Sequence, residues 1–246
     1  MNRFFLDNEC ISKDWVRFPE DLAHQIVHVL RMGDGDSVQV LDNRVQIYLV
    51  RLQVDKQSND VSGKIVGIEA AGGEPQVEIT LYFGLSNRDK VEWILQKGTE
   101  VGVKTFAPFV SRRTLVQTTV LSEKRKNRWE NIIREAAEQS YRGRIPTLYD
   151  PVDLQLALNH NKESFDLCLM AWEGSSCSEG LNEALAGSGT RRIALFVGPE
   201  GGFSEEEVQA ARKAGCQVVS LGARILRMET AAILFPALVL SALDAL

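Results

Sequence analysis

Hydrophobic and polar residues follow two different rhythms along the chain. Before residue 70, runs rich in β-branched residues predict strands over 37–42, 45–54 and 61–70, separated by polar turns. The preceding segment, 19–32, carries apolar residues at the spacing of an amphipathic helix, namely Leu22, Ile26, Val29 and Leu30. Several short strands of this kind indicate a small barrel.

From residue 76 onward, strand and helix patterns alternate. Apolar runs predict strands over 77–85, 106–110, 165–172, 192–198 and 217–222, and helices over 88–103 and 124–141. This alternation indicates an α/β domain with a mainly parallel sheet. The glycine and proline of segment 71–75 predict a boundary between domains 1–72 and 73–246. Because ligands bind beyond the carboxyl ends of parallel strands, we expect functional loops after Ala171, Val197 and Leu221.

The last segment, 229–246, is apolar on nearly every side. Its uncharged run from Thr230 to Leu243 is too short to cross a bilayer, so we expect a buried helix between the sheet and a second subunit. Pro236 predicts a kink or an early break in it. The surface expected to meet the second subunit consists of Ile233, Leu234, Leu238 and Val239.

Composition places the chain among ordinary globular proteins, since 44% of its residues are hydrophobic and 25% are charged. The first residues lack the long apolar core of a signal peptide, so we expect a cytoplasmic protein. The four cysteines, Cys10, Cys168, Cys177 and Cys216, include no C-x-x-C pair. This spacing argues against zinc and thioredoxin-type sites and predicts free thiols.

Charge is distributed unevenly although the net charge is only −5. Residues 104–144 hold ten basic and four acidic side chains, a balance of +6, whereas residues 145–246 hold seven and thirteen, a balance of −6. The basic stretch is either a phosphate-binding surface or a solvated helix face, and charge alone does not decide between them.

Two loops carry candidate chemistry. The first, 197–204, has three glycines in five positions, which allow close approach to a ligand, and Ser204 with Glu207 predicts a capping box after it. It matches neither the dinucleotide nor the P-loop signature, which disfavours a nucleotide-dependent oxidoreductase; a tight structural turn and a ligand loop both remain open. The second loop, 221–231, places Arg227 and Glu229 beside an apolar core, as functional groups or as a structural ion pair.

Five separated strings occur in order: HVLRMGDGD, DKVEWILQKGTEVGV, EQSYRGRIP, GPEGGFSEEE and LGARILRMETA. Together they resemble the bacterial 16S ribosomal RNA uridine N3-methyltransferases of the SPOUT superfamily, over nearly the whole chain. The resemblance implies a PUA-like RNA-docking barrel, a SPOUT α/β domain with a deep trefoil knot, and a homodimer. It also implies S-adenosylmethionine as methyl donor and 16S rRNA of the small ribosomal subunit as substrate. The alternatives are a SPOUT enzyme acting on another RNA or position, and an inactive RNA-binding assembly factor.

Site residues follow from the same resemblance. It implies donor binding by loop residues Ala171, Trp172, Gly198, Pro199, Glu200, Gly201, Gly202, Leu221, Gly222, Ile225, Leu226 and Arg227, with Glu173 and Ala223 beside them. Methylation at N3 requires loss of the imide proton, and we assign Glu229 as candidate base and Arg227 as the group that stabilises charge or orients the uracil.

RNA-binding residues are expected at Gln139, Arg142 and Arg144 in the EQSYRGRIP string, and at Arg3 and Arg31 in the first domain. Tyr141 is more readily a packing residue than a platform for a base. His24 and His28 have zincin spacing but lack the glutamate and a third ligand, so we expect no metal site.

Overall fold

The computed structural model describes residues 1–44, 46–55, 60–174, 179–186 and 189–245. The chain divides into two compact units. The first comprises Met1–Glu74 and Ala137–Ile145, and the second comprises Pro75–Ala136 and Pro146–Leu246. The expected boundary at residues 72 and 73 lies beside the first of these divisions. The hydrophobic pattern did not predict that residues 137–145 belong to the first unit.

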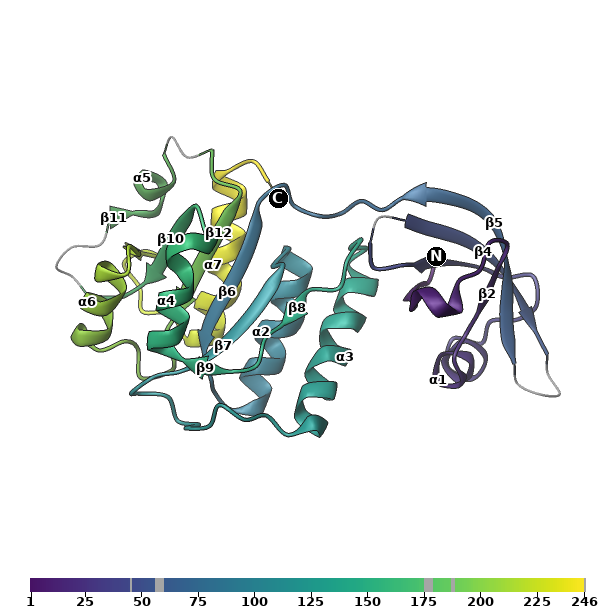
Figure 1. Ribbon diagram of the computed structural model, residues 1–246, viewed down its shortest axis with the longest axis horizontal. Helices are drawn as coiled ribbons and strands as arrows, with labels where there is room; N and C mark the ends of the chain where they lie inside the picture. Colours follow the sequence, from purple (N-terminus) through teal and green to yellow (C-terminus); the bar gives the residue numbers. More distant parts are fainter. Residues whose placement is uncertain (45, 56–59, 175–178, 187–188, 246) are drawn as a thin grey trace. The chain divides into compact units, whose positions relative to one another are not determined.

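The first unit contains a curled mixed sheet of five strands in the order β1-β3-β4-β5-β2 (Figure 1). The predicted strands correspond to β3 (Ser37–Leu41), β4 (Gln46–Val54) and β5 (Val61–Ala70). The sequence missed β1 (Arg3–Phe5) and β2 (Trp15–Arg17), because three residues are too few to establish an alternation. Only the pairing of β1 with β3 is parallel among these strands.

The helix expected over 19–32 is present but changes type along its length. A short 3-10 turn, η1 (Asn8–Cys10), comes earlier; α1 (Glu20–His24) then continues into a π-helical segment, η2 (Gln25–Val29). Ile26 is fully buried, whereas Val29 and Leu30, expected on the same stripe, are exposed. The i→i+5 bond from the amide of Leu30 to the carbonyl of Gln25 widens the turn and shifts the stripe out of register.

The second unit is built on an eight-stranded sheet whose pairings are all parallel. Its order is β11-β13-β10-β12-β6-β7-β8, and β9 also pairs with β7. The strands are β6 (Glu78–Gly84), β7 (Thr105–Val110), β8 (Thr147–Leu148), β9 (Val152–Asp153), β10 (Leu167–Ala171), β11 (Glu179–Gly180), β12 (Arg192–Val197) and β13 (Gln217–Ser220). The predicted α/β class and parallel sheet are therefore confirmed.

Helices cover both faces of this sheet (Figure 1). On one face, α4 (Leu154–Ser164) and α6 (Glu205–Lys213) pack on a core that includes Phe109, Met170 and Phe196. On the other, α2 (Arg88–Val101) packs against α7 (Met228–Ala242). The remaining helices are α3 (Glu123–Gln139) and α5 (Leu181–Leu185). The predicted capping box is formed: Ser204 and Glu207 exchange backbone-to-side-chain hydrogen bonds of 2.8 and 3.3 Å.

Helix α7 continues through Pro236 to Ala242, so the early break expected there does not occur. One side of α7 is buried, including Phe235, whereas Leu234 and Leu238, one turn apart, are exposed. Val239, expected on the outer surface, is fully buried. No helix among the described residues is long and apolar enough to span a membrane.

The expectation of free thiols throughout is wrong for two cysteines. Cys168 and Cys216 form a disulfide with a Cα–Cα distance of 4.6 Å. They are 48 residues apart in sequence but directly precede the paired residues Leu169 and Gln217 of β10 and β13, which brings them together. Cys10 is free, and Cys177 lies outside the described residues.

Candidate functional site

Three loops meet at one edge of the second unit's sheet. They follow β10 after Ala171, β12 after Val197 and β13 after Ser220, and these strands are neighbours in the order β13-β10-β12. Because the strands are parallel, their carboxyl ends lie at the same edge, where sheets of this type bind ligands. The sequence anticipated this convergence.

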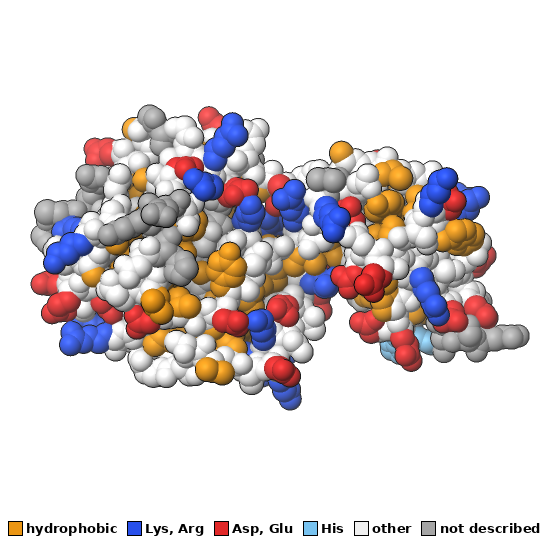
Figure 2. Space-filling view, in the orientation of Figure 1, with side chains coloured by type: hydrophobic (Ala, Val, Ile, Leu, Met, Phe, Trp, Pro, Cys, Tyr) orange, Lys and Arg blue, Asp and Glu red, His pale blue; other side chains and the backbone are white. Residues whose placement is uncertain are grey.

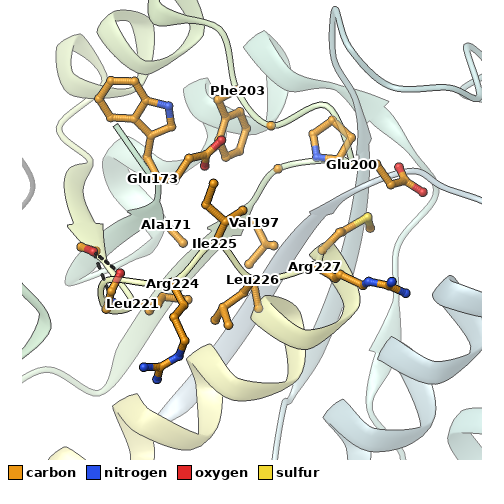
Figure 3. Close-up of a pocket in the computed structure, with 18 of the residues that line it drawn as sticks. Ala171, Glu173, Val197, Glu200, Phe203, Leu221, Arg224, Ile225, Leu226 and Arg227 are labelled. Atoms are coloured by element: carbon orange, nitrogen blue, oxygen red, sulfur yellow. Dashed lines mark hydrogen bonds between the residues drawn. The ribbon is translucent and has the colours of Figure 1, made fainter. Parts of the chain in front are cut away.

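The loops enclose a cavity of ≈ 300 Å³ (Figure 3). The side chains of Ala171, Val197, Ile225 and Leu226 gather at its centre, with Glu200 and Arg227 toward one side. Eleven of the twelve residues expected to bind the donor line the cavity, and Gly201 is the exception. The other lining residues are Lys90, Glu173, Val197, Phe203, Ser220, Arg224, Met228 and Ala231. Its size lies within the range of small-molecule sites.

The glycines of the loops have different tasks. Gly202 has φ +65°, and a Cβ there would lie 2.8 Å from Oε1 of Glu173. Gly222 has φ +116° and open space around the Cβ position. Both conformations favour glycine. Gly201, by contrast, has no positive φ, and its Cβ would point at the Cβ of Arg113, 3.0 Å away. The backbone conformation therefore requires glycine at 202 and 222, both of which line the cavity, whereas Gly201 does not line it and faces Arg113.

Two further residues support the 198–203 loop, and the sequence did not single them out. Arg113 Nη1 donates hydrogen bonds to the carbonyls of Gly201 and Phe203, at 3.0 and 3.3 Å. Gly84 ends β6 directly against Pro199, so a Cβ at Gly84 would lie 2.6 Å from the Pro199 nitrogen. The loop is thus held from two sides by residues far away in sequence.

A chain of polar contacts lies at one end of the cavity and begins on α2. Lys90 Nζ donates to Glu200 Oε1 at 3.0 Å, and Ser86 Oγ donates to the same oxygen. Burial by itself would raise the pKa of Glu200, but hydrogen bonds from Ser86, from a backbone amide and from Lys90 together outweigh it and lower that pKa below its ordinary value. Glu200 therefore carries a negative charge at neutral pH.

Glu229 joins this chain from the first turn of α7. Its Oε2 atom lies 3.9 Å from Lys90 Nζ. That oxygen is buried and has no hydrogen-bond partner among the described residues. Arg227 immediately precedes α7 and lines the cavity. The two residues expected to carry the chemistry are therefore both at the cavity end where Lys90 lies.

Ser86 and Lys90 were not predicted from the sequence. They follow β6, a fourth parallel strand whose carboxyl end lies at the same edge as those of the other three. Attention to every parallel strand, rather than to the glycine-rich loops alone, would have found them.

The expected RNA-binding residues all belong to the first unit. Arg31, Gln139 and Arg144 are exposed. The guanidinium of Arg3 instead lies over the ring of Tyr141, 4.4 Å from its centroid, and Arg3 Nε donates to Gln39 at 2.7 Å. Burial lowers the pKa of Arg3. Tyr141 has φ +61° and supports this packing.

Arg142 is not accessible in the way expected of an RNA-binding residue. Its side chain is 3% exposed, and its Nη2 and Nε atoms donate to the carboxylate of Glu74 at 2.6 and 3.2 Å. Glu74 also accepts from the amides of Gly143 and Arg144, at 3.1 and 3.2 Å. The arrangement is a structural ion pair that fixes the turn after α3, and it leaves Arg144 as the exposed arginine of the EQSYRGRIP string.

Acidic residues from other parts of the chain neutralise several basic side chains of the stretch 104–144. Its partners come from elsewhere in the chain: Lys104 pairs with Glu78, Lys126 with Asp150 at 3.0 Å, and Arg112 with Glu206 at 3.7 Å. Figure 2 accordingly shows basic and acidic side chains interspersed on the face in view. Local charge counting misses these pairs because they join residues distant in sequence.

Arg128 belongs to the same set of pairs. Its Nε and Nη2 atoms both donate to the carboxylate of Glu92. This hydrogen bonding is the main reason that the pKa of Glu92 is lowered to about 2, and a further bond from Arg88 adds to it. Arg128 is therefore engaged with α2 rather than free to meet phosphate.

The imidazole rings of His24 and His28 are tilted by 42° to each other, with their centroids 4.7 Å apart. No group of three or more potential metal ligands occurs among the residues that the structure describes.

Known proteins of similar sequence or structure include RNA methyltransferases. The RNA methyltransferase domain family matches residues 73–240. The chain is 35% identical to the ribosomal RNA small subunit methyltransferase E of Bacillus subtilis, over 85% of this chain and 83% of that protein. It also resembles the crystal structure of the corresponding Neisseria gonorrhoeae enzyme bound to S-adenosyl methionine, with a TM-score of 0.86, 31% identity, and coverage of 98% and 97%. A Legionella pneumophila protein in complex with the same cofactor matches with a TM-score of 0.85 and 27% identity, covering 98% and 97%.

Proposed function

Since this chain belongs to the RNA methyltransferase family, within the group of ribosomal RNA small subunit methyltransferases E, we propose that it methylates N3 of a uridine in 16S rRNA, with S-adenosylmethionine as donor. The observation that carries the proposal is the convergence of three strand-end loops on one cavity that Glu200, Arg227 and Glu229 border or adjoin. That cavity combines apolar walls, glycine-lined backbone and ionisable groups, as a methyl-transfer site requires.

The residues present fit the donor. The positive φ of Gly202 and Gly222 lets backbone approach a ligand closely, and backbone N–H and C=O groups can recognise an adenine ring. The carboxylates of Glu173 and Glu200 border the cavity, which suits a ligand with a cationic centre. When bound, S-adenosylmethionine supplies a methyl group on a positively charged sulfonium. We assign donor binding to the loops 171–173, 198–203 and 221–227, with Gly201 acting through the shape of its loop.

We assign recognition and deprotonation of the uracil to Arg227 and Glu229, which lie at one end of the cavity. N3 carries a proton that must leave, and Glu229 offers a buried carboxylate oxygen without a hydrogen-bond partner among the described residues. Arg227 borders the same space and is suited to stabilise negative charge on a uracil carbonyl or to orient the base.

Several finer features belong to the same proposal. They are a trefoil knot formed by the loops of the second unit, a PUA-like barrel in the first, a homodimer and a cytoplasmic location. The exposed Leu234 and Leu238 of α7 suit a subunit interface. We assign RNA contacts in the first unit to Arg31, Gln139 and Arg144, which are exposed, and a supporting role to Arg3 and Arg142.

Primer extension on ribosomal RNA tests the function. Methylation at N3 blocks Watson–Crick pairing, so reverse transcription should stop at one uridine of 16S rRNA when small subunits are treated with protein and donor. Untreated subunits, and subunits treated with protein alone, should give no such stop. Nucleoside mass spectrometry should identify the product as N3-methyluridine. A product methylated on the ribose or on another base would overturn the assignment.

A further inference from the structure

Lys90 occupies a position at the cavity that none of the roles above uses. It stands on the first turn of α2, lines the cavity, and lies 3.0 Å from Glu200 Oε1 and 3.9 Å from Glu229 Oε2. Its side chain is 33% exposed, so it is within reach of a ligand, whereas that of Glu229 is 17% exposed. One ammonium group thus faces two carboxylates at the cavity end where Arg227 also lies.

The carboxylate of Glu229 has one oxygen, Oε2, that accepts no hydrogen bond from the described residues. Glu229 Oε2 lies beyond hydrogen-bond distance of Lys90 and has no other hydrogen-bond partner among the described residues. A buried acceptor left in this state costs free energy that a partner would recover. A purely structural ion pair would be expected to close this gap, as Lys90 does with Glu200. Glu229 adjoins the cavity lining, so a side-chain rotation that turns this oxygen toward the cavity would let an N–H donor of a ligand satisfy it.

We propose that Lys90 and Glu229 together select uracil over cytosine, an inference that rests on the proposed N3 methylation. The pairing edge of uracil presents a carbonyl oxygen, the N3–H and a second carbonyl oxygen. An ammonium donor beside a carboxylate acceptor matches one carbonyl and the N3–H. Cytosine inverts the pattern, because its N3 is an acceptor and its 4-amino group is a donor. The Glu229 carboxylate would face a lone pair at N3, and a buried acceptor without a partner disfavours binding.

The same pair fits the proton balance of the reaction. The N3–H proton would pass to the Glu229 carboxylate, and its electron pair would stay on N3 to form the bond to the methyl carbon. The bond between that carbon and the sulfonium sulfur would break with its electron pair left on sulfur, which releases S-adenosylhomocysteine as a neutral thioether. Negative charge that develops on the neighbouring carbonyl oxygen is stabilised by the Lys90 ammonium. Glu200, held ionised by Ser86, keeps Lys90 in place and acts as a positioning residue.

The test compares Lys90→Met with Lys97→Met. Lys97 lies two turns further along the same helix, where it pairs with Glu100 at 2.8 Å and does not line the cavity. The probes are small subunits with either uridine or cytidine at the nucleotide mapped by primer extension. Binding is measured with the donor site saturated by S-adenosylhomocysteine, so that the readout does not depend on turnover. Donor affinity is measured separately by titration calorimetry.

Wild type and Lys97→Met should prefer the uridine subunit by at least about tenfold, the usual discrimination of a paired donor–acceptor contact. Lys90→Met should lose most of this preference and keep donor affinity within about threefold, whereas Lys90→Arg should retain part of it. If Lys90→Met does not fold, Lys90→Gln replaces it. An unchanged preference in a folded Lys90 variant overturns the inference while N3 methylation stands. A wild-type product other than N3-methyluridine overturns both.

Discussion

Gly202 offers a direct test of how the donor loop works. Valine at this position must adopt φ near +65°, where an L-residue is strained by about 1–2 kcal/mol. In a unit of this size, that strain should lower the melting temperature by about 2–8 °C. The Cβ atom would also lie 2.8 Å from Glu173 Oε1, and the two methyl groups would occupy space in a cavity of ≈ 300 Å³.

Strain alone does not predict loss of the ligand, so Gly215 provides the matched control. It has φ +90° between α6 and β13, and no atom lies within 4 Å of its Cβ position. Gly215→Val should therefore show a similar thermal shift with unchanged donor binding. Gly202→Val should weaken donor binding by at least about tenfold, or 1.4 kcal/mol, in titration calorimetry. Equal donor affinities of two folded variants would show that Gly202 does not border the donor and that the assigned cavity is wrong.

Three other perturbations test separate parts of the structure. Glu74→Gln leaves the buried Arg142 without its charge partner, so we expect a loss of about 3 kcal/mol in urea unfolding; an unchanged midpoint would mean that the pair contributes little. Arg144→Ala should reduce the magnitude of the log–log salt slope of RNA binding by about 0.7–0.9, whereas the control Arg191→Ala should leave the slope unchanged. Identical slopes for the two variants would show that Arg144 does not contact RNA phosphate. Leu238→Lys should shift the protein from dimer to monomer in light scattering, and a wild-type protein that is already a stable, active monomer would end the dimer proposal.

The sequence predicted what depends on local pattern. The alternation of apolar runs of strand length with helical segments predicted the parallel sheet, and the cap formed by Ser204 and Glu207 is present as expected. The position of the cavity followed from strand direction, because the loops after Ala171 and Val197 leave parallel neighbours.

What the sequence missed depends on contacts between distant residues. The disulfide of Cys168 joins strands that are neighbours only in the folded sheet. The burial of Arg142 depends on Glu74, 68 residues away, so its charge indicated an exposed contact where the fold makes an internal one. The orientation of Gly201 likewise depends on Arg113, which no local rule connects to the glycine loop.

The return of Ala137–Ile145 to the first unit has a consequence for how the protein can be cut and recombined. Ala137 is fully buried in a cluster with Phe5, Leu41 and Ile47, and Glu138 accepts a hydrogen bond from the amide of Phe5 at 3.0 Å. A fragment that stops at residue 74 would lose these contacts and leave Glu74 without its arginine. The N-terminal unit is therefore not a detachable module at the end of the chain. Transplanting it onto another enzyme would require both segments, with the first part of the catalytic unit between them and the remainder after the second segment.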